Sequence, residues 1–282
     1  MTADHAHRSR TLIVTFLGSV VREMGGWMPI AGTIDLMGEL GVDAPSVRTA
    51  VFRLKRRDWL SAETRGRARG YRLTERALSV LAQGDEVIWH ARRPADLADG
   101  WCIVNFSVPE SDRSKRYKLR THLSNLGFGN VGTAMWLAPA RMRTAAEEAI
   151  ANLGLDKHAA VFVGDYVGTQ DLTSLLYESW DLAGIDASYR DFVQHYTQLA
   201  SRLETDEWIE PRQAFTRYLG VIDAWRRLPF RDPGLPREVL AEDWNAPAAV
   251  ALFERLTHLL QQPALRYAAG AWDGAADAPD RR

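Results

Sequence analysis

The side chains best suited to chemistry in this sequence are cations gathered between residues 44 and 72. This stretch holds nine basic residues and two acidic ones, which leaves a local charge of +7, whereas the whole chain of 282 residues has a formal charge of −1. Such a concentration of Lys and Arg raises the local electrostatic potential and attracts polyanions such as nucleic acids. A solvated helix face can have the same composition, so the position of each cation decides between the two interpretations.

Several of these side chains share one face of a helix predicted over residues 44–58. The stripe consists of Ser46, Thr49, Arg53 and Arg56, spaced three, four and three residues apart. An α-helix fits the major groove of DNA, where short polar and Arg side chains reach the base edges, and arginines of a neighbouring hairpin would reach phosphates or the minor groove. The candidate DNA-binding residues are Ser46, Arg48, Thr49, Arg53, Lys55, Arg56, Arg57, Arg65, Arg67 and Arg69.

The elements that must position these residues follow the order of a winged helix-turn-helix. Apolar periodicity predicts a helix over 11–23 and a second helix over 29–40, and Asp43 is the expected N-cap of the third. Residues 59–73 then predict two short strands around a glycine-bearing loop, followed by a fourth helix after Thr74. We therefore expect residues 1–97 to form a winged-helix DNA-binding domain.

The middle segment predicts a small domain with alternating strands and helices. Strands are expected at 101–108, 127–131, 134–138 and 159–166, and helices at 112–126 and 144–153. This βαββαβ order is that of a ferredoxin-like fold over residues 98–167. Cys102, on the first strand, is expected to point inward as a small buried hydrophobe.

The last segment, residues 168–282, predicts a helical domain, with a final helix expected over 248–260. Its formal charge is −6, against +4 for residues 1–97 and +1 for the middle segment. Arginines lie among aromatic residues here, a mixture that could bind an anionic organic effector. The candidate effector-binding residues are Arg217, Tyr218, Trp225, Arg226 and Arg227. An aromatic core with solvated arginines is the alternative interpretation and the favoured one.

The chain lacks the sequence signatures of common catalytic and metal sites. Cys102 is its single cysteine, and HxxxH, CxxC, GxSxG and Walker patterns are absent, so we predict no catalytic residue, metal ligand or cofactor. The N-terminal residues 1–10 are polar and show no secretory signal, and the apolar stretch over 12–21 is too short to span a membrane. We expect a cytoplasmic protein without a membrane partner.

Taken in order, several motifs resemble the PaaX-type regulators, the repressor family of phenylacetic acid degradation. They are Val47-Arg48-Thr49-Ala50-Val51-Phe52-Arg53-Leu54, Trp59-Leu60, Gly70-Tyr71-Arg72-Leu73-Thr74, Arg231-Asp232-Pro233-Gly234-Leu235-Pro236 and Asp243-Trp244. Two positions depart from the family pattern. Asp58 and Ala77 stand where the family often has glycine.

The resemblance implies an α+β multidomain repressor with a winged helix, a middle domain similar to CRISPR-associated ferredoxin-like endoribonucleases, and a C-terminal helical effector or dimerisation domain. It also implies a homodimer on palindromic double-stranded operator DNA. The implied effector that releases the DNA is an acyl-coenzyme A such as phenylacetyl-coenzyme A. The departures leave open whether the effector is that compound or another acyl-coenzyme A or aromatic acid.

Two other functions are compatible with the sequence. A metal-dependent nuclease could be built on the middle domain, although the first predicted strand of that domain carries no Asp at its end and Asp112 lies beyond it. A protein-interacting scaffold is the third possibility, since winged helices also bind proteins.

Overall fold

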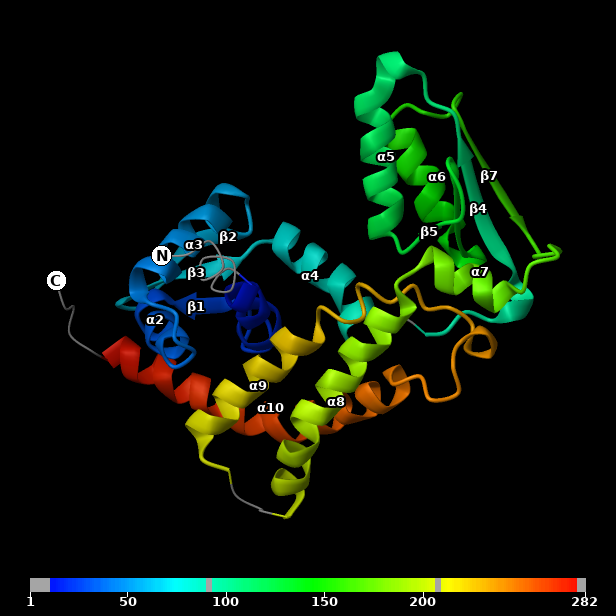
Figure 1. The fold of residues 1–282 in the computed structure, drawn as a ribbon. Helices are drawn as coiled ribbons and strands as arrows, with labels where there is room; N and C mark the ends of the chain where they lie inside the picture. The colour runs from blue at the N-terminus through cyan, green and yellow to red at the C-terminus, as the bar shows by residue number, and fades with distance from the viewer. Residues whose placement is uncertain (1–10, 90–92, 206–208, 278–282) are drawn as a thin grey trace. The chain divides into compact units, whose positions relative to one another are not determined.

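The structure is a computed structural model that describes residues 11–89, 93–205 and 209–277. Within these ranges the chain is a mixed α+β protein with two antiparallel sheets, which confirms the predicted class (Figure 1). It packs as two compact units. Of the described residues, the first unit takes in those up to Glu86, those of Gln194–Arg226 and those from Val250 onward, and the second takes in those of Val87–Val193 and Arg227–Ala249. Residues 1–10, for which the sequence predicts no secretory signal, lie outside the described residues.

The N-terminal part of the first unit contains helices and a three-stranded antiparallel sheet. Residues 11–16 form an α-helix that continues as a π-helix, η1 (Leu17–Val21). The elements that follow are β1 (Trp27–Pro29), α2 (Ile30–Gly38), α3 (Ala44–Arg56), β2 (Leu60–Arg65), β3 (Ala68–Leu73) and α4 (Glu75–Ile88). The sheet order β1-β3-β2 makes β3 the central strand.

Two details of this region differ from the sequence prediction. The first helix does not stay regular to residue 23, because the backbone N–H of Arg22 donates to the carbonyl of Leu17 at 3.0 Å, which is the wider spacing of a π-helix. The second helix begins at Ile30, because the preceding three residues, ending in Pro29, form strand β1. A three-residue strand is too short to show alternation in the sequence, and here its pairing with β3 defines it.

Helices from the C-terminal part of the chain complete the first unit. They are α9 (Pro211–Trp225), the end of α8 (Leu182–Thr205) and most of α10 (Ala246–Asp277). The ring of Phe16 packs edge-on against Phe215 and against Trp272, each with ring centroids 6.4 Å apart. The N-terminal helix and the two C-terminal helices therefore share one aromatic core, in which these three side chains are buried.

The last helix is longer than the sequence predicts. We expected it over 248–260, whereas α10 runs from Ala246 to Asp277 with Pro263 inside it. A proline removes one helical hydrogen bond and crowds the preceding turn. Continued burial on the far side of the proline accounts for the extension, because Ala264, Ala268 and Trp272 are all buried.

The second unit contains a four-stranded antiparallel sheet covered on one face by two helices. Its elements are β4 (Trp101–Phe106), α5 (Arg113–Asn125), β5 (Gly129–Asn130), β6 (Met135–Pro139), α6 (Arg143–Asn152) and β7 (Ala159–Gly164). The chain order βαββαβ and the sheet order β5-β6-β4-β7 together confirm the predicted ferredoxin-like fold. Its core holds Cys102, Phe106 and Trp136, and burial raises the pKa of the Cys102 thiol to about 11.

Helix α7 (Leu172–Ser179), the first half of α8 and the segment over residues 227–245 also belong to this unit. The indole N–H of Trp180 donates to the carbonyl of Gly127 at 3.0 Å. In the loop, the carboxylate of Asp232 accepts from the Tyr189 hydroxyl at 3.0 Å and from the backbone N–H of Gly234 at 2.8 Å. Arg141 donates to the carbonyl of Gly234 at 3.0 Å. Asp232 and Gly234, which belong to a motif of the family resemblance, thus fix the conformation of this loop.

Helix α3 ends in a turn that requires a left-handed residue. The backbone N–H of Trp59 donates to the carbonyl of Leu54 at 2.9 Å, and the N–H of Asp58 donates to that of Lys55 at 3.0 Å. This Schellman pattern places Asp58 at φ +58, which glycine adopts most easily. The departure from glycine noted in the sequence therefore falls on a position with backbone strain.

We expect the effect of a substitution at Asp58 on stability to depend on how well the new residue tolerates a positive φ. Asp58→Val should lower the free energy of unfolding by about 1–2 kcal/mol, because a β-branched residue is disfavoured there. Asp58→Gly should cause no loss and gain up to about 1 kcal/mol. Urea unfolding followed by circular dichroism measures both. A valine variant as stable as the wild type would refute the strain at this turn.

Candidate nucleic-acid interface

The orientation of α3 follows from its buried face. Asp43 caps the helix by accepting from the backbone N–H of Ser46 at 2.7 Å, and Pro45 occupies the first turn. The buried side chains are Val47, Ala50, Val51 and Leu54. Because these positions face the core, the remaining positions of the helix face outward.

The polar residues predicted on α3 are brought together on its outer side. Arg48, Thr49, Arg53, Lys55, Arg56 and Arg57 are exposed, and Ser46 is half-buried next to its cap. The stripe expected from the spacing therefore exists as a surface of the folded chain. Its cationic side chains have donors only, so the surface is suited to phosphate and to base acceptors.

The hairpin β2–β3 carries the other predicted arginines. Its strands pair from Leu60↔Leu73 to Arg65↔Ala68, which leaves a two-residue turn of Gly66 and Arg67. Gly66 has φ +56, which suits a tight hairpin turn. Arg67 and Arg69 are exposed at this end of the hairpin.

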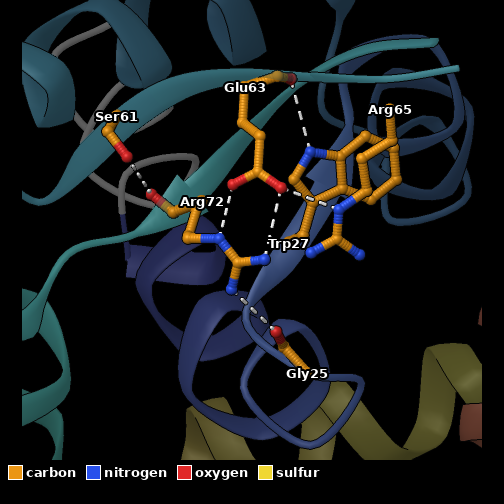
Figure 2. A network of polar contacts seen from close by, with 6 residues as sticks. All are labelled: Gly25, Trp27, Ser61, Glu63, Arg65 and Arg72. Atoms are coloured by element: carbon orange, nitrogen blue, oxygen red, sulfur yellow. Dashed lines mark hydrogen bonds and ion pairs between the residues drawn. The ribbon is translucent and has the colours of Figure 1, made fainter. Parts of the chain in front are cut away.

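A carboxylate inside the hairpin organises two of its arginines (Figure 2). Glu63 accepts from Nε of Arg65 at 2.8 Å, and also from Nε at 2.5 Å and from Nη2 at 3.2 Å of Arg72. Hydrogen bonds from Arg72 first and Arg65 second hold the pKa of the Glu63 carboxyl below its ordinary value of 4.5. Arg72 also donates to the carbonyl of Gly25 at 3.4 Å.

Trp27 of β1 connects this network to the rest of the sheet. Its indole N–H donates to the Glu63 carbonyl at 3.3 Å, and the Arg65 guanidinium lies 4.7 Å from the centre of its ring. Gly70 allows this approach, because a Cβ there would lie 2.3 Å from the Met28 carbonyl and 2.8 Å from the Trp27 ring. The hairpin is thereby held against β1.

The network divides the predicted DNA-binding cations into two groups. Arg65 is occupied by Glu63 and Trp27, although it remains exposed. Within the described part of the chain, no side-chain hydrogen bond or ion pair is found for Arg48, Arg53, Lys55, Arg56, Arg57, Arg67 and Arg69. These seven side chains are free to meet an anion from outside.

Sequence reasoning did not identify Trp27 or Glu63 as part of the site. Glu63 could have been found from the hairpin register, since pairing with Gly70 makes Arg72 its diagonal neighbour and Arg65 follows two residues later on the same face. Trp27 lies in the short strand β1 and gave no local signal.

The five candidate effector-binding residues differ in their surroundings. Tyr218 and Trp225 are fully buried, and Trp225 stacks on Phe253 with ring centroids 4.6 Å apart. Nε of Arg226 lies 3.3 Å from Oδ1 of Asp223, and the side chain of Arg217 is exposed. Arg227 belongs to the second compact unit. An effector role for these residues stays a prediction, and the aromatic members occupy the core.

No cluster of three or more His, Cys, Asp or Glu side chains that could hold a metal ion occurs in the described ranges. A metal-dependent nuclease on the ferredoxin-like fold stays an untested alternative. None of the helices in the described ranges combines the length and the apolar character needed to cross a membrane.

Comparison with known proteins identifies the family. Models for the PaaX-like protein, the PaaX protein central Cas2-like domain and the PaaX-like protein C-terminal domain match residues 8–77, 94–176 and 180–270. The transcriptional repressor PaaX of Escherichia coli strain K12 is 26% identical over 243 residues, which cover 85% of this chain and 76% of that protein. The chain belongs to the PaaX family, as its motifs predicted.

A solved structure supports the fold as a whole. The uncharacterized protein Rv0674 from Mycobacterium tuberculosis superposes with a TM-score of 0.60 at 18% sequence identity. The match covers 95% of this chain and 98% of that one. At this level of identity the likeness concerns the fold alone.

The Glu63 network predicts a stability difference that depends on pH. Because the folded-state pKa of Glu63 is lowered, its contribution to stability is present above the ordinary value of 4.5 and is lost as pH falls through the folded value. Glu63→Gln should therefore lower the free energy of unfolding at pH 7, and the gap to the wild type should narrow as the buffer is acidified below 4.5. Denaturant unfolding over this pH range measures the gap.

Glu148→Gln, at an exposed glutamate of α6, controls for the removal of one negative charge. A gap between wild type and Glu63→Gln that stays constant with pH would contradict the role given to the carboxylate.

Proposed function

We propose that this chain is a ligand-responsive DNA-binding transcriptional repressor. The observation that carries the proposal is the set of seven exposed cationic side chains without a side-chain partner on α3 and at the end of the hairpin β2–β3. Phosphate contacts from such side chains supply affinity, and contacts to base edges supply discrimination.

The N-terminal part acts as a winged helix-turn-helix in this proposal. Helices α2 and α3 form the helix-turn-helix, α3 enters the major groove, and β2–β3 is the wing. The chain order β1-α2-α3-β2-β3 and the sheet order β1-β3-β2 support this assignment. Arg53 then faces base edges from the middle of the exposed stripe, and Arg67 reaches the backbone from the turn of the wing.

The family supports a proposal for the regulated genes and for the role of each segment of the chain. Since the relative from Escherichia coli is a transcriptional repressor, we propose repression of an operon for phenylacetate-type aromatic acids. Residues 1–97 would bind DNA, 98–167 would form the ferredoxin-like domain, and 168–282 would serve effector binding and dimerisation. A homodimer on a palindromic operator in the cytoplasm completes the proposal.

Two arginines test the assignment of helix and wing. Arg53→Ala should weaken binding to a preferred duplex by about 1–3 kcal/mol and relax sequence preference, because a bidentate contact to a base edge is lost. Arg67→Ala should weaken binding to all DNA sequences to a similar degree and reduce the dependence of affinity on salt concentration, because a phosphate contact is lost. Fluorescence anisotropy with the promoter DNA beside the chain's own gene, at several salt concentrations, measures both effects.

Arg202→Ala is the matched control, since it removes an exposed arginine from α8 outside the proposed interface. It should leave affinity and salt dependence unchanged. Wild-type binding that shows no salt dependence, or equal effects of all three variants, would contradict the proposed interface.

The effector is tested by release of the DNA. We expect an acyl-coenzyme A, with phenylacetyl-coenzyme A as the first compound to try, to lower the affinity of the wild-type protein for the same duplex. Free phenylacetate and coenzyme A serve as controls, and an anisotropy titration with each compound gives the comparison. Release by free phenylacetate alone would refute an acyl-coenzyme A effector.

A further inference from the structure

An exposed aromatic side chain stands at the centre of the cationic face of α3. Phe52 is 61% exposed, although α3 has a complete buried face without it. On a helix its nearest neighbours are three and four residues away, and these are Arg48, Thr49, Lys55 and Arg56. Four hydrogen-bonding side chains, three of them cationic, therefore surround one apolar ring.

The same ring lines a groove of about 560 Å³ within the first unit. The lining residues are Ile30, Arg48, Val51, Phe52, Lys55, Arg56 and Tyr71. No carboxylate is among them, so the groove combines an apolar wall with three positive charges. An occupant complementary to this groove is anionic and offers an apolar feature at the position of the ring.

Duplex DNA meets both requirements. Its phosphates are complementary to the three cations, and the C5-methyl group of thymine is the apolar feature that the major groove displays. An apolar protein segment would instead have to cover three cations whose charges it does not balance, which is costly.

We propose that Phe52 is a specificity-determining residue that packs against a thymine methyl group in the major groove, while the cations around it bind phosphates and base edges. This inference rests on the proposed function, because it requires α3 to enter duplex DNA. It adds a readout of thymine to a surface otherwise composed of hydrogen-bond donors. Phe52 was not among the residues predicted to contact DNA.

The test uses the thymine methyl itself as the probe. Duplexes preferred by the wild-type full chain are first selected from a random pool. Each thymine is then replaced singly by deoxyuridine, which removes only the methyl group, and affinities are measured by anisotropy. We expect at least one replacement to weaken wild-type binding about three- to fivefold, which corresponds to the burial of one methyl group. Phe52→Ala should bind the parent duplex more weakly and be insensitive to that replacement.

Two further variants keep the result interpretable. Phe52→Leu retains an apolar side chain and should preserve part of the sensitivity to deoxyuridine. Val80→Ala, at an exposed apolar residue of α4 that does not line the groove, should behave as the wild type. Phe52 is exposed, so circular dichroism and thermal melting should show an intact fold for its variants.

The outcomes separate this inference from the proposed function. If the wild type selects no duplex and binds DNA without salt dependence, the proposed function fails. If the wild type binds but Phe52→Ala keeps the same sensitivity at every thymine, the role of Phe52 is overturned. Repression lost in cells with DNA binding unchanged in Phe52→Ala would also overturn it and would indicate a protein partner at the groove.

Discussion

The carboxylate of Glu63 is the constraint on which the candidate interface depends. It accepts hydrogen bonds from Arg65 and Arg72, and the backbone carbonyl of the same residue accepts from the indole N–H of Trp27. Glu63 thus contacts β1 through its main chain and occupies Arg65 and Arg72 through its side chain. Without the carboxylate, the guanidinium groups of Arg65 and Arg72 would repel each other, and the hairpin would lose the hydrogen bonds that join β2 to β3 through these side chains. The cations of the hairpin are thus divided by one carboxylate into those that have a partner within the chain and those that are free.

Much of the fold could be predicted from the sequence, because amphipathic spacing and strand order are local signals. The buried and exposed faces of α3 and the ferredoxin-like order of β4 to β7 were predicted in this way. Strand β1 and the network around Trp27 could not be, since each is defined by partners distant in the sequence. Trp225 shows the opposite case, because its position among arginines was compatible with an effector site, although the core in which it lies was the favoured interpretation.

The motifs that best carry the family resemblance in the last segment have a structural explanation. Asp232 and Gly234 anchor their loop to Tyr189 and Arg141. In the same unit Asp186 accepts from the backbone N–H of Asn245 at 2.7 Å, next to Trp244, whose ring meets that of Tyr189 edge-on. These contacts account for the motif without any ligand. The resemblance of this motif to that of the family therefore indicates a shared loop conformation. It does not by itself indicate a shared effector.

The aromatic core formed by Phe16, Phe215 and Trp272 joins sequence positions from both ends of the chain. A fragment that stops before α9 would expose the ring of Phe16 to water and lose two of its neighbours. A single recombination event that transferred only the N-terminal helices to another regulator would therefore leave behind the C-terminal helices that bury Phe16. New regulators of this kind are expected to arise by duplication of the whole gene followed by divergence, since the beginning and the end of the polypeptide must be inherited together.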